Sequence, residues 1–244
     1  MQKVHVLMRK EDLDPARLSG KVVVVIDVLF ATSTIVAAFE HGVADVVPAA
    51  DPDAARAAAR GMEDGSYLLA GEHNMAPIEG FATYAPLALT REPLAGRRLI
   101  YSTTNGTVAL YRARGADQVY AGALRNGAAV AAHIRRHHPE ETVLLVCAGS
   151  GGEFNLEDFY GAGYLVDRLL AGEAHRWQVS DAGVAACALY RHQADAPAEC
   201  LAASWLGTLL REIGSGDELR FAAMPGACSA VPVLEGDRLV SAAS

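Results

Sequence analysis

The stretch "VVVVIDVLFATSTIVAAFEHG" at residues 22–42 joins a continuous apolar run to an alanine-rich helical pattern. Residues 22–28 have the β-branched composition of a strand buried on both faces, and 33–41 predict a helix. Asp27 ends the apolar run, and three hydroxyl side chains follow at 32–34, where the helix begins. Because a helix start needs only one capping side chain, this surplus of polar groups predicts a functional site.

The same alternation of strand and helix continues along most of the chain. Apolar, β-branched runs predict strands at 3–7, 22–28, 44–48, 66–70, 97–102, 117–121 and 142–148. Alanine-rich stretches predict helices at 33–41, 52–62, 105–114, 125–137, 155–171, 181–193 and 198–213. This order predicts an α/β fold with a largely parallel sheet flanked by helices. With no low-complexity linker, we expect one unit over 1–244, and a division into two subdomains stays open.

Two segments share the order helix, glycine, aspartate, strand: "TIVAAFEHGVADVV" from Thr34 and "TVALYRARGADQVY" from Thr107. Each follows a strand and a hydroxyl-rich turn, and a third unit has the glycine-rich turn "AGSGGEF" at 148–154. The match indicates either an internal repeat of strand–turn–helix units or two βαβ units that are only similar to each other. In an open parallel sheet such turns gather at the carboxyl edge, where ligands bind.

Composition excludes several classes of protein. The 244 residues carry a formal net charge of −8, which argues against a nucleic-acid or anionic-membrane partner. No apolar run approaches the roughly 20 residues of a spanning helix, and the first residues lack the core of a signal peptide. The cysteines are widely spaced and form no C-x-x-C pair, so we expect reduced thiols in a cytoplasmic protein. They are Cys147, Cys187, Cys200 and Cys228.

Hydroxyl and amide side chains at two of the turns predict an anion site. Thr32 and Ser33 stand in the first turn, and Ser102, Thr103 and Asn105 stand in the second, "STTNGT". A helix start presents unpaired N–H groups and a partial positive charge, so it can hold a phosphate, and hydroxyls add donors. Ordinary helix capping better explains any one of these side chains alone, whereas the clusters together favour the anion site.

Acidic side chains occupy the same turns. Asp27 ends its strand, Glu72 follows "SYLLAG", and Glu157 and Asp158 lie at the start of the third helix. Carboxylates repel a phosphate unless a hard cation intervenes, and Mg²⁺ takes one or two carboxylates together with phosphate oxygens. The four acids therefore predict a Mg²⁺ site. The alternative for Glu157 and Asp158 is capping of the helix, because Asn155 and Asp158 have capping-box spacing.

Other motif readings fail. A haloacid-dehalogenase phosphatase needs a second aspartate two residues after Asp27, where Leu29 stands, and the chain has no G-x-x-x-x-G-K-[ST] loop. The "GSGGEF" turn has Phe154 where a dinucleotide fingerprint needs its last glycine. Cys147 ends an apolar strand, where a cysteine is usually a small core residue, so we expect it to be structural.

Four segments together resemble the 2-phosphosulfolactate phosphatases: 22–42, "STTNGT" at 102–107, "CAGSGGEFNLEDFYGAG" at 147–163 and "AVPVLEGDRL" at 230–239. The resemblance covers nearly the whole chain and implies an α/β homodimer that hydrolyses phosphosulfolactate with Mg²⁺ on a route to coenzyme M. It also implies which positions lie near the site. They are Asp27, Thr32, Ser33, Glu72, Ser102, Thr103, Asn105, Glu157 and Asp158.

The chain departs from the family pattern at several positions. Phe30 and His73 replace arginines, the segment 80–88 loses its polar residues, and Trp205-Leu206 replaces a small polar pair. Arginine grips sulfonate, carboxylate or phosphate with two hydrogen bonds, and phenylalanine cannot. Arg125 is then the best remaining clamp for an anion. We expect the Phe30 side chain to face the ligand and to favour an apolar group there.

Two classes of function remain. The first is a Mg²⁺-dependent phosphatase acting on 2-phosphosulfolactate or a related, less anionic small phosphoester. The second is a non-catalytic relative that binds a small molecule on the same scaffold. The four acids favour the enzyme, since a binding protein has no need of them, and the lost arginines favour the second class.

Overall fold

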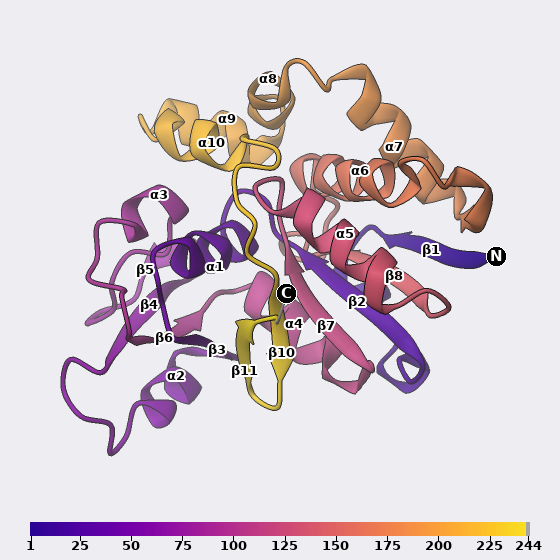
Figure 1. Cartoon of the computed structure of the whole chain (residues 1–244). Helices are drawn as coiled ribbons and strands as arrows, with labels where there is room; N and C mark the ends of the chain where they lie inside the picture. The colour runs from indigo at the N-terminus through magenta and orange to yellow at the C-terminus, as the bar shows by residue number, and fades with distance from the viewer. Residues whose placement is uncertain (243–244) are drawn as a thin grey trace.

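The computed structural model describes residues 1–242. Within this part, eleven strands form one sheet in the order β5-β4-β6-β3-β11-β10-β7-β2-β8-β1-β9 (Figure 1). The strands are β1 (Gln2–Leu7), β2 (Lys21–Ile26), β3 (Asp45–Ala49), β4 (Tyr67–His73), β5 (Ala76–Pro77), β6 (Arg98–Ser102), β7 (Gln118–Gly122), β8 (Thr142–Cys147), β9 (Trp177–Val179), β10 (Pro232–Glu235) and β11 (Arg238–Ser241). All seven predicted strands are present.

The sheet consists of two parallel blocks joined by a hairpin. One block contains β7, β2, β8, β1 and β9, and the other contains β4, β6 and β3. The hairpin β10–β11 lies between them and pairs antiparallel with β7 on one side and β3 on the other. The prediction of a largely parallel sheet is therefore confirmed, and the hairpin is a feature that the sequence pattern did not predict.

The hairpin reverses the direction of the second block, because three successive pairings between β7 and β3 are antiparallel. In a flat sheet the carboxyl ends of β2 and β6 would then lie at opposite edges. However, five steps in strand order separate β2 from β6, and a twist of about 20–25° per step turns them by roughly 100–125°. Figure 1 shows the two blocks running in clearly different directions. Strand twist thus allows the two carboxyl ends to converge.

Helices cover both faces of the larger block. Along β2, Val22, Val24 and Ile26 pack in one core cluster with α5 and α6, whereas Val23 and Val25 pack in another with α1 and α4. This is why the strand reads as an unbroken apolar run. The helices are α1 (Ala31–Glu40), α2 (Pro52–Ala58), α3 (Pro86–Leu89), α4 (Gly106–Arg112), α5 (Gly127–His137), α6 (Leu156–Leu170), α7 (Asp181–His192), α8 (Pro197–Ala202), α9 (Trp205–Glu212) and α10 (Gly216–Ala222).

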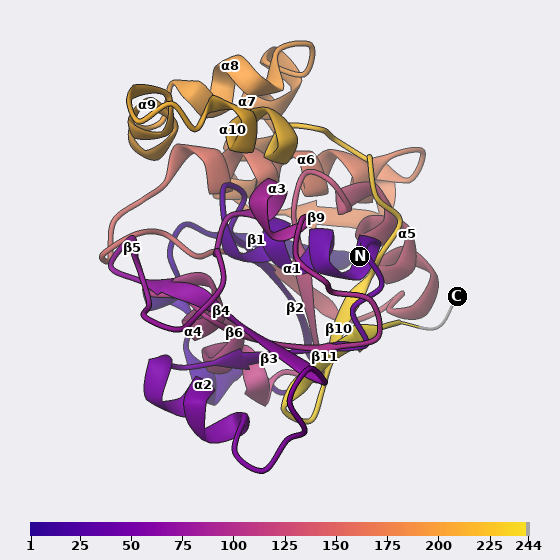
Figure 2. The ribbon, with the colours of Figure 1, turned by 90° about the vertical axis from the view of Figure 1, so that its left-hand side faces the viewer.

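The predicted helix at 198–213 is wrong as a single element. The structure breaks it into α8 and α9 at Ser204, whose hydroxyl accepts a hydrogen bond from the amide of Gly207 at 3.0 Å and so caps the second helix. Figure 2 shows α10 beside α3. The Glu218 carboxylate of α10 accepts the amides of Leu87 and Ala88 of α3 at 2.7 and 2.9 Å. These contacts hold the last helices beside the segment that follows β4.

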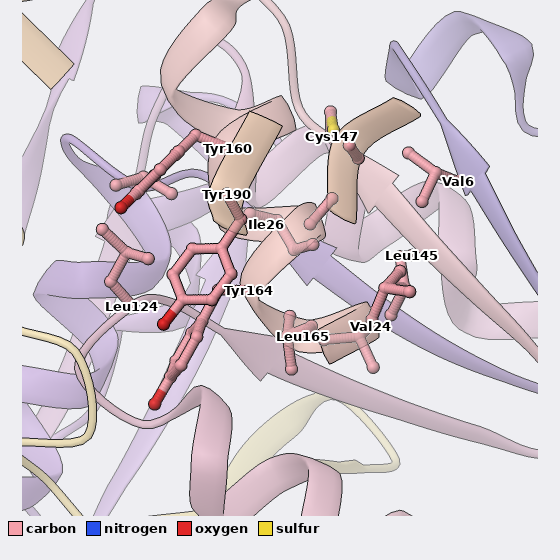
Figure 3. Close-up of a cluster of buried hydrophobic side chains, with 14 of the residues drawn as sticks. Val6, Val24, Ile26, Leu124, Leu145, Cys147, Tyr160, Tyr164, Leu165 and Tyr190 are labelled. Atoms are coloured by element: carbon pink, nitrogen blue, oxygen red, sulfur yellow. The ribbon is translucent and has the colours of Figure 1, made fainter. Parts of the chain in front are cut away.

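Aromatic packing fixes α6 on the sheet (Figure 3). Tyr160 and Tyr164 of α6 lie with their ring centroids 5.4 and 5.1 Å from that of Tyr190 on α7. The same cluster contains Ile26 of β2 and Cys147 of β8. The start of α6 is thereby held against the ends of β2 and β8. Across residues 1–242, the helices are too short or too polar to cross a membrane.

Candidate active site

A pocket of about 520 Å³ lies where the turns after β2, β6 and β8 meet the loop after β4 and the start of α9. Its lining residues are Asp27, Phe30, Glu72, Asn74, Met75, Tyr84, Thr103, Thr104, Asn105, Gly149, Ser150, Gly151, Glu153, Phe154, Asn155, Trp205 and Leu206. A larger hollow of about 640 Å³ between α1, α5 and the segment before β10 contains none of these turns. The smaller pocket is therefore the candidate site.

The turn after β2 is closed by its own side chains. The Thr32 hydroxyl accepts the Asp27 amide and donates to the Asp27 carbonyl, both at 2.9 Å. Ser33 donates to the carbonyl of Val28. Both hydroxyls are fully buried and do not line the pocket. Their hydrogen bonds are therefore made with the backbone of the turn. The partly buried carboxyl of Asp27 does line the pocket.

The turn after β6 contributes Thr103 and Asn105 to the lining. The Thr103 amide donates to the Thr107 hydroxyl at 2.9 Å, and the Thr107 amide donates to the Thr103 hydroxyl at 3.1 Å. This reciprocal pair holds the entry to α4. Ser102 ends β6, is buried and is not part of the lining.

Gly106, the first residue of α4, brings this turn against Asp27. A Cβ at Gly106 would lie 2.5 Å from Asp27 Oδ2 and even closer to Ala31 Cβ, so only glycine permits the approach. The starts of α1 and α4 are therefore in direct contact. The residue pattern "NGT" gave no sign of this contact, because it joins positions far apart in the chain.

Lys10 is a buried cation that the sequence reasoning did not place at the site. Its ammonium donates to Asn105 Oδ1 at 2.8 Å and to the carbonyl of Ala148 at 3.2 Å, and it pairs with Glu11 at 3.0 Å. Lys10 thus joins the turns after β6 and β8 from behind the pocket lining. The sequence around Lys10 contains no motif that would predict its contact with these two distant turns.

Glu72 holds the rim of the pocket. One carboxylate oxygen accepts the Thr104 amide at 2.6 Å, and the other accepts the Met75 amide at 2.7 Å and the Thr104 hydroxyl at 3.0 Å. Asn74 and Met75 have φ of 51° and 64° and are the non-glycine residues with positive φ within 1–242. Such strain persists only where surrounding contacts enforce it, and it is common at functional sites.

Glu157 and Asp158 are buried in the first turn of α6 and do not line the pocket. The two Asp158 oxygens accept the amides of Val28 at 2.9 Å and Gly149 at 3.1 Å, which ties the turns after β2 and β8 together. In the described part of the chain, no three His, Cys, Asp or Glu side chains form a group that could hold a metal ion. The four predicted ligands are thus divided: Asp27 and Glu72 reach the pocket, and the α6 pair supports it.

The acids nevertheless act on one another electrostatically. Burial raises the pKa of Asp27 to about 7, against the lowering effect of the Ala31 and Phe30 amides, and the charges of Glu157 and Glu72 add to the rise. Burial and then the charges of Asp27 and Glu157 raise the pKa of Asp158 well above its ordinary value. Removing negative charge or adding a cation would therefore reduce the repulsion among these carboxylates in the folded state.

Arg125 is not at this pocket, which corrects its prediction as an anion clamp. Its guanidinium is buried, pairs with Glu40 at 2.6 Å and lies 3.9 Å from the ring centroid of Phe221. The charge is thus already neutralised at the end of α1. Phe30, in contrast, lines the pocket as expected and packs edge-on against Tyr84, with ring centroids 5.0 Å apart.

An α/β sheet with a carboxylate-containing pocket among its strand-to-helix turns is the architecture of a small-molecule enzyme site. A sequence model of the family described as 2-phosphosulpholactate phosphatase matches residues 7–237. The chain therefore belongs to this family, whose members are classed as phosphoric monoester hydrolases.

Three relatives illustrate the similarity, and each bears the name "Probable 2-phosphosulfolactate phosphatase". The protein of Symbiobacterium thermophilum is 38% identical over 94% of this chain and 98% of its own. That of Prochlorococcus marinus is 39% identical over 86% and 87%, and that of Deinococcus radiodurans is 37% identical over 91% of each. The resemblance seen in the sequence is thus confirmed.

A Cys147→Ala variant is expected to keep its phosphatase activity within about twofold. Cys147 is fully buried at the end of β8, and burial followed by the charges of Asp158 and Glu157 raises the pKa of its thiol well above the ordinary value. A nucleophilic cysteine needs the opposite environment. Steady-state kinetics on folded protein check this. A loss of several orders of magnitude would show that the thiol attacks the substrate.

Proposed function

We propose that the chain hydrolyses 2-phosphosulfolactate or a related small phosphoester in a Mg²⁺-dependent reaction. The observation that carries this proposal is the pairing of Asp27 and Glu72 in one pocket whose lining, within residues 1–242, includes no lysine, arginine or histidine. A phosphate cannot approach two carboxylates without a cation. The oxygen donors present suit a hard cation such as Mg²⁺.

Asp27 is the residue best placed to hold the ion. Its Oδ1 accepts the Phe30 amide at 3.3 Å, and its carboxyl faces the pocket. Glu72 adds negative charge, while its oxygens are engaged by backbone amides. When bound, Mg²⁺ supplies Lewis-acid polarisation of the phosphoryl group and lowers the pKa of a bound water.

The chain itself supplies positioning of the phosphate. Residues that immediately precede three helices line the pocket: Phe30 before α1, Asn105 before α4 and Asn155 before α6. The positive ends of these helices are therefore near the same space, and their dipoles favour an anion there. The glycine-rich segment 149–151 lets the backbone approach the ligand closely. These groups would stabilise the charge that develops on the phosphoryl oxygens.

Millimolar Mg²⁺ is expected to raise the melting temperature of the chain and to be required for hydrolysis of an aryl phosphate and of 2-phosphosulfolactate. The ion relieves repulsion among Asp27, Glu72 and Glu157 in the folded state alone, so its binding stabilises that state. Differential scanning with Mg²⁺ and with EDTA measures the first effect, and phosphate release measures the second.

Asp27→Asn is the control for both measurements, because it should lose the thermal shift together with activity. A shift of the same size in this variant would place the ion elsewhere. Binding of a phosphate analogue without hydrolysis of any phosphoester would favour the non-catalytic alternative. The homodimer implied by the resemblance and the cytoplasmic location are further proposals, and light scattering tests the first of them.

A further inference from the structure

Part of the pocket lining is formed by apolar side chains from separate segments of the chain. We call it the apolar wall, and it consists of Phe30, Met75, Tyr84, Phe154, Trp205 and Leu206. Trp205 is 70% exposed, Phe154 45% and Met75 40%. Large apolar side chains that are exposed together inside a pocket favour contact with an apolar part of a ligand.

Contacts within the protein hold Phe30, Met75, Tyr84 and Phe154 of the wall before any ligand binds. The carbonyl of Tyr84 accepts the hydroxyls of Thr34 and Tyr101 at 2.8 and 2.7 Å, and the Tyr84 hydroxyl donates to the Met75 carbonyl at 3.3 Å. Phe30 packs on the Tyr84 ring. Phe154 packs edge-on against Phe159, with ring centroids 5.3 Å apart. These contacts hold the aromatic side chains at the edge of a pocket of about 520 Å³, which is large enough for a ring.

The charges around the wall exclude a second anionic group. Asp27, Glu72 and Glu153 line the pocket, and no basic side chain of the described chain joins them. Two basic side chains that contact the lining segments are engaged by other groups: Lys10 by Asn105 and Glu11, and Arg9 by the carbonyl of Gly152 and by Asp12. A sulfonate or carboxylate placed against the wall would lose its hydration and find no partner.

We propose that the substrate of this pocket is a phosphomonoester whose phosphate is its only anionic group and whose other end is an aromatic or branched apolar group resting on the apolar wall. This proposal rests on the proposed phosphatase activity and narrows its substrate. The phosphate lies on the Asp27 side, near the helix starts, and the apolar end contacts Trp205 and Phe154.

The first test compares hydrolysis of benzyl phosphate, methyl phosphate and 2-phosphosulfolactate in the presence of Mg²⁺. Benzyl phosphate is expected to have the highest kcat/KM. Trp205→Ala should raise the KM for benzyl phosphate about tenfold and the KM for methyl phosphate much less, because only the benzyl ring reaches the wall. Ile213→Ala is the matched control: Ile213 is 62% exposed just beyond the other end of α9 and lies outside the pocket.

The second variant places a cation in the wall. Phe30→Arg is expected to lower kcat/KM for benzyl phosphate and to raise it for 2-phosphosulfolactate, each by about tenfold, since a guanidinium can pair with the additional anionic groups. If the parent chain prefers 2-phosphosulfolactate and Phe30→Arg brings no gain, the proposed substrate class is wrong while the phosphatase activity stands.

A binding measurement separates the two proposals when no ester is hydrolysed. Benzylphosphonate is expected to change the tryptophan emission of the parent chain and not that of Trp205→Phe, because Trp177 is buried. That result without hydrolysis would refute the phosphatase and support the apolar ligand class. Equal binding of benzylphosphonate and methylphosphonate, or binding of neither, would refute the ligand class.

Discussion

An Asp27→Asn variant is expected to lose phosphatase activity by about a hundred- to a thousandfold and to be more stable than the parent chain at pH 8. Loss of the carboxylate removes the charge that the proposed Mg²⁺ ion needs, and such electrostatic stabilisation of a transition state amounts to several kcal/mol. The amide keeps an oxygen that can accept the Phe30 amide, so the turn after β2 is expected to persist. Activity and stability therefore change in opposite directions.

The stability effect depends on pH with a definite sign. The folded-state pKa of Asp27 is about 7 and its ordinary value is 3.8, so the folded chain holds a proton that the unfolded chain has already released. The parent chain consequently loses stability as the pH rises from about 4 to about 7, and the asparagine variant lacks this loss. Its advantage is largest at pH 8, shrinks as the pH falls below about 7 and vanishes near pH 4.

Thermal unfolding without added metal at pH 8, 6 and 4 measures this profile. Asp45→Asn is the matched control, because hydrogen bonding to Arg98 holds the pKa of Asp45 below its ordinary value. That variant should be less stable than the parent chain by a similar amount at pH 8 and pH 6, because this stabilisation begins to be lost only near pH 4. An active Asp27→Asn, or one no more stable than the parent at pH 8, would contradict the role given to Asp27.

A Gly106→Ala variant is expected to lose most of its activity and about 1–3 kcal/mol of stability. The added methyl group would overlap Asp27 Oδ2 and Ala31 Cβ, so either α4 moves away from α1 or the Asp27 carboxyl leaves its position. Both outcomes disturb the pocket. Chemical denaturation and steady-state kinetics measure the two losses.

Gly216→Ala provides the comparison, since Gly216 also begins a helix and a Cβ there would meet only the end of the Arg220 side chain, at 3.5 Å. This variant is expected to match the parent in activity and stability. Adding Ala31→Gly to Gly106→Ala removes one of the two overlaps and should restore part of the stability. Equal behaviour of the two alanine variants would show that the contact between α1 and α4 is not tight.

Short elements were the least predictable part of the fold. The runs 22–28 and 142–148 are long, apolar and bounded by turns, and both are strands in the structure. In contrast, β10 and β11 have four residues each, and their place between two parallel blocks depends on single paired positions with β7 and β3. Periodicity cannot reveal a pairing between chain segments more than a hundred residues apart.

The site shows the same division. Asp27 and Phe30 were predicted to face a ligand from their place at one strand end, and both line the pocket. Asp158 and Glu72 were predicted as metal ligands from their charge, their place on the turns and the family resemblance, and their oxygens accept backbone amides. Charge indicates that an acid needs a partner, but it does not say whether the partner is a metal ion or an N–H group.

By itself, the sequence determined the α/β class, the seven longer strands, the family and the presence of polar turns after β2, β6 and β8, because local composition and spacing carry these features. Only the tertiary structure decided which turns meet. The twist across the hairpin brings the ends of β2 and β6 together, Gly106 lets α4 touch Asp27, and Lys10 ties the turns from behind. The tertiary structure also pairs Arg125 with Glu40 and brings the residues of the apolar wall together. These contacts join distant parts of the chain, and their formation depends on packing, burial and charge in the folded state.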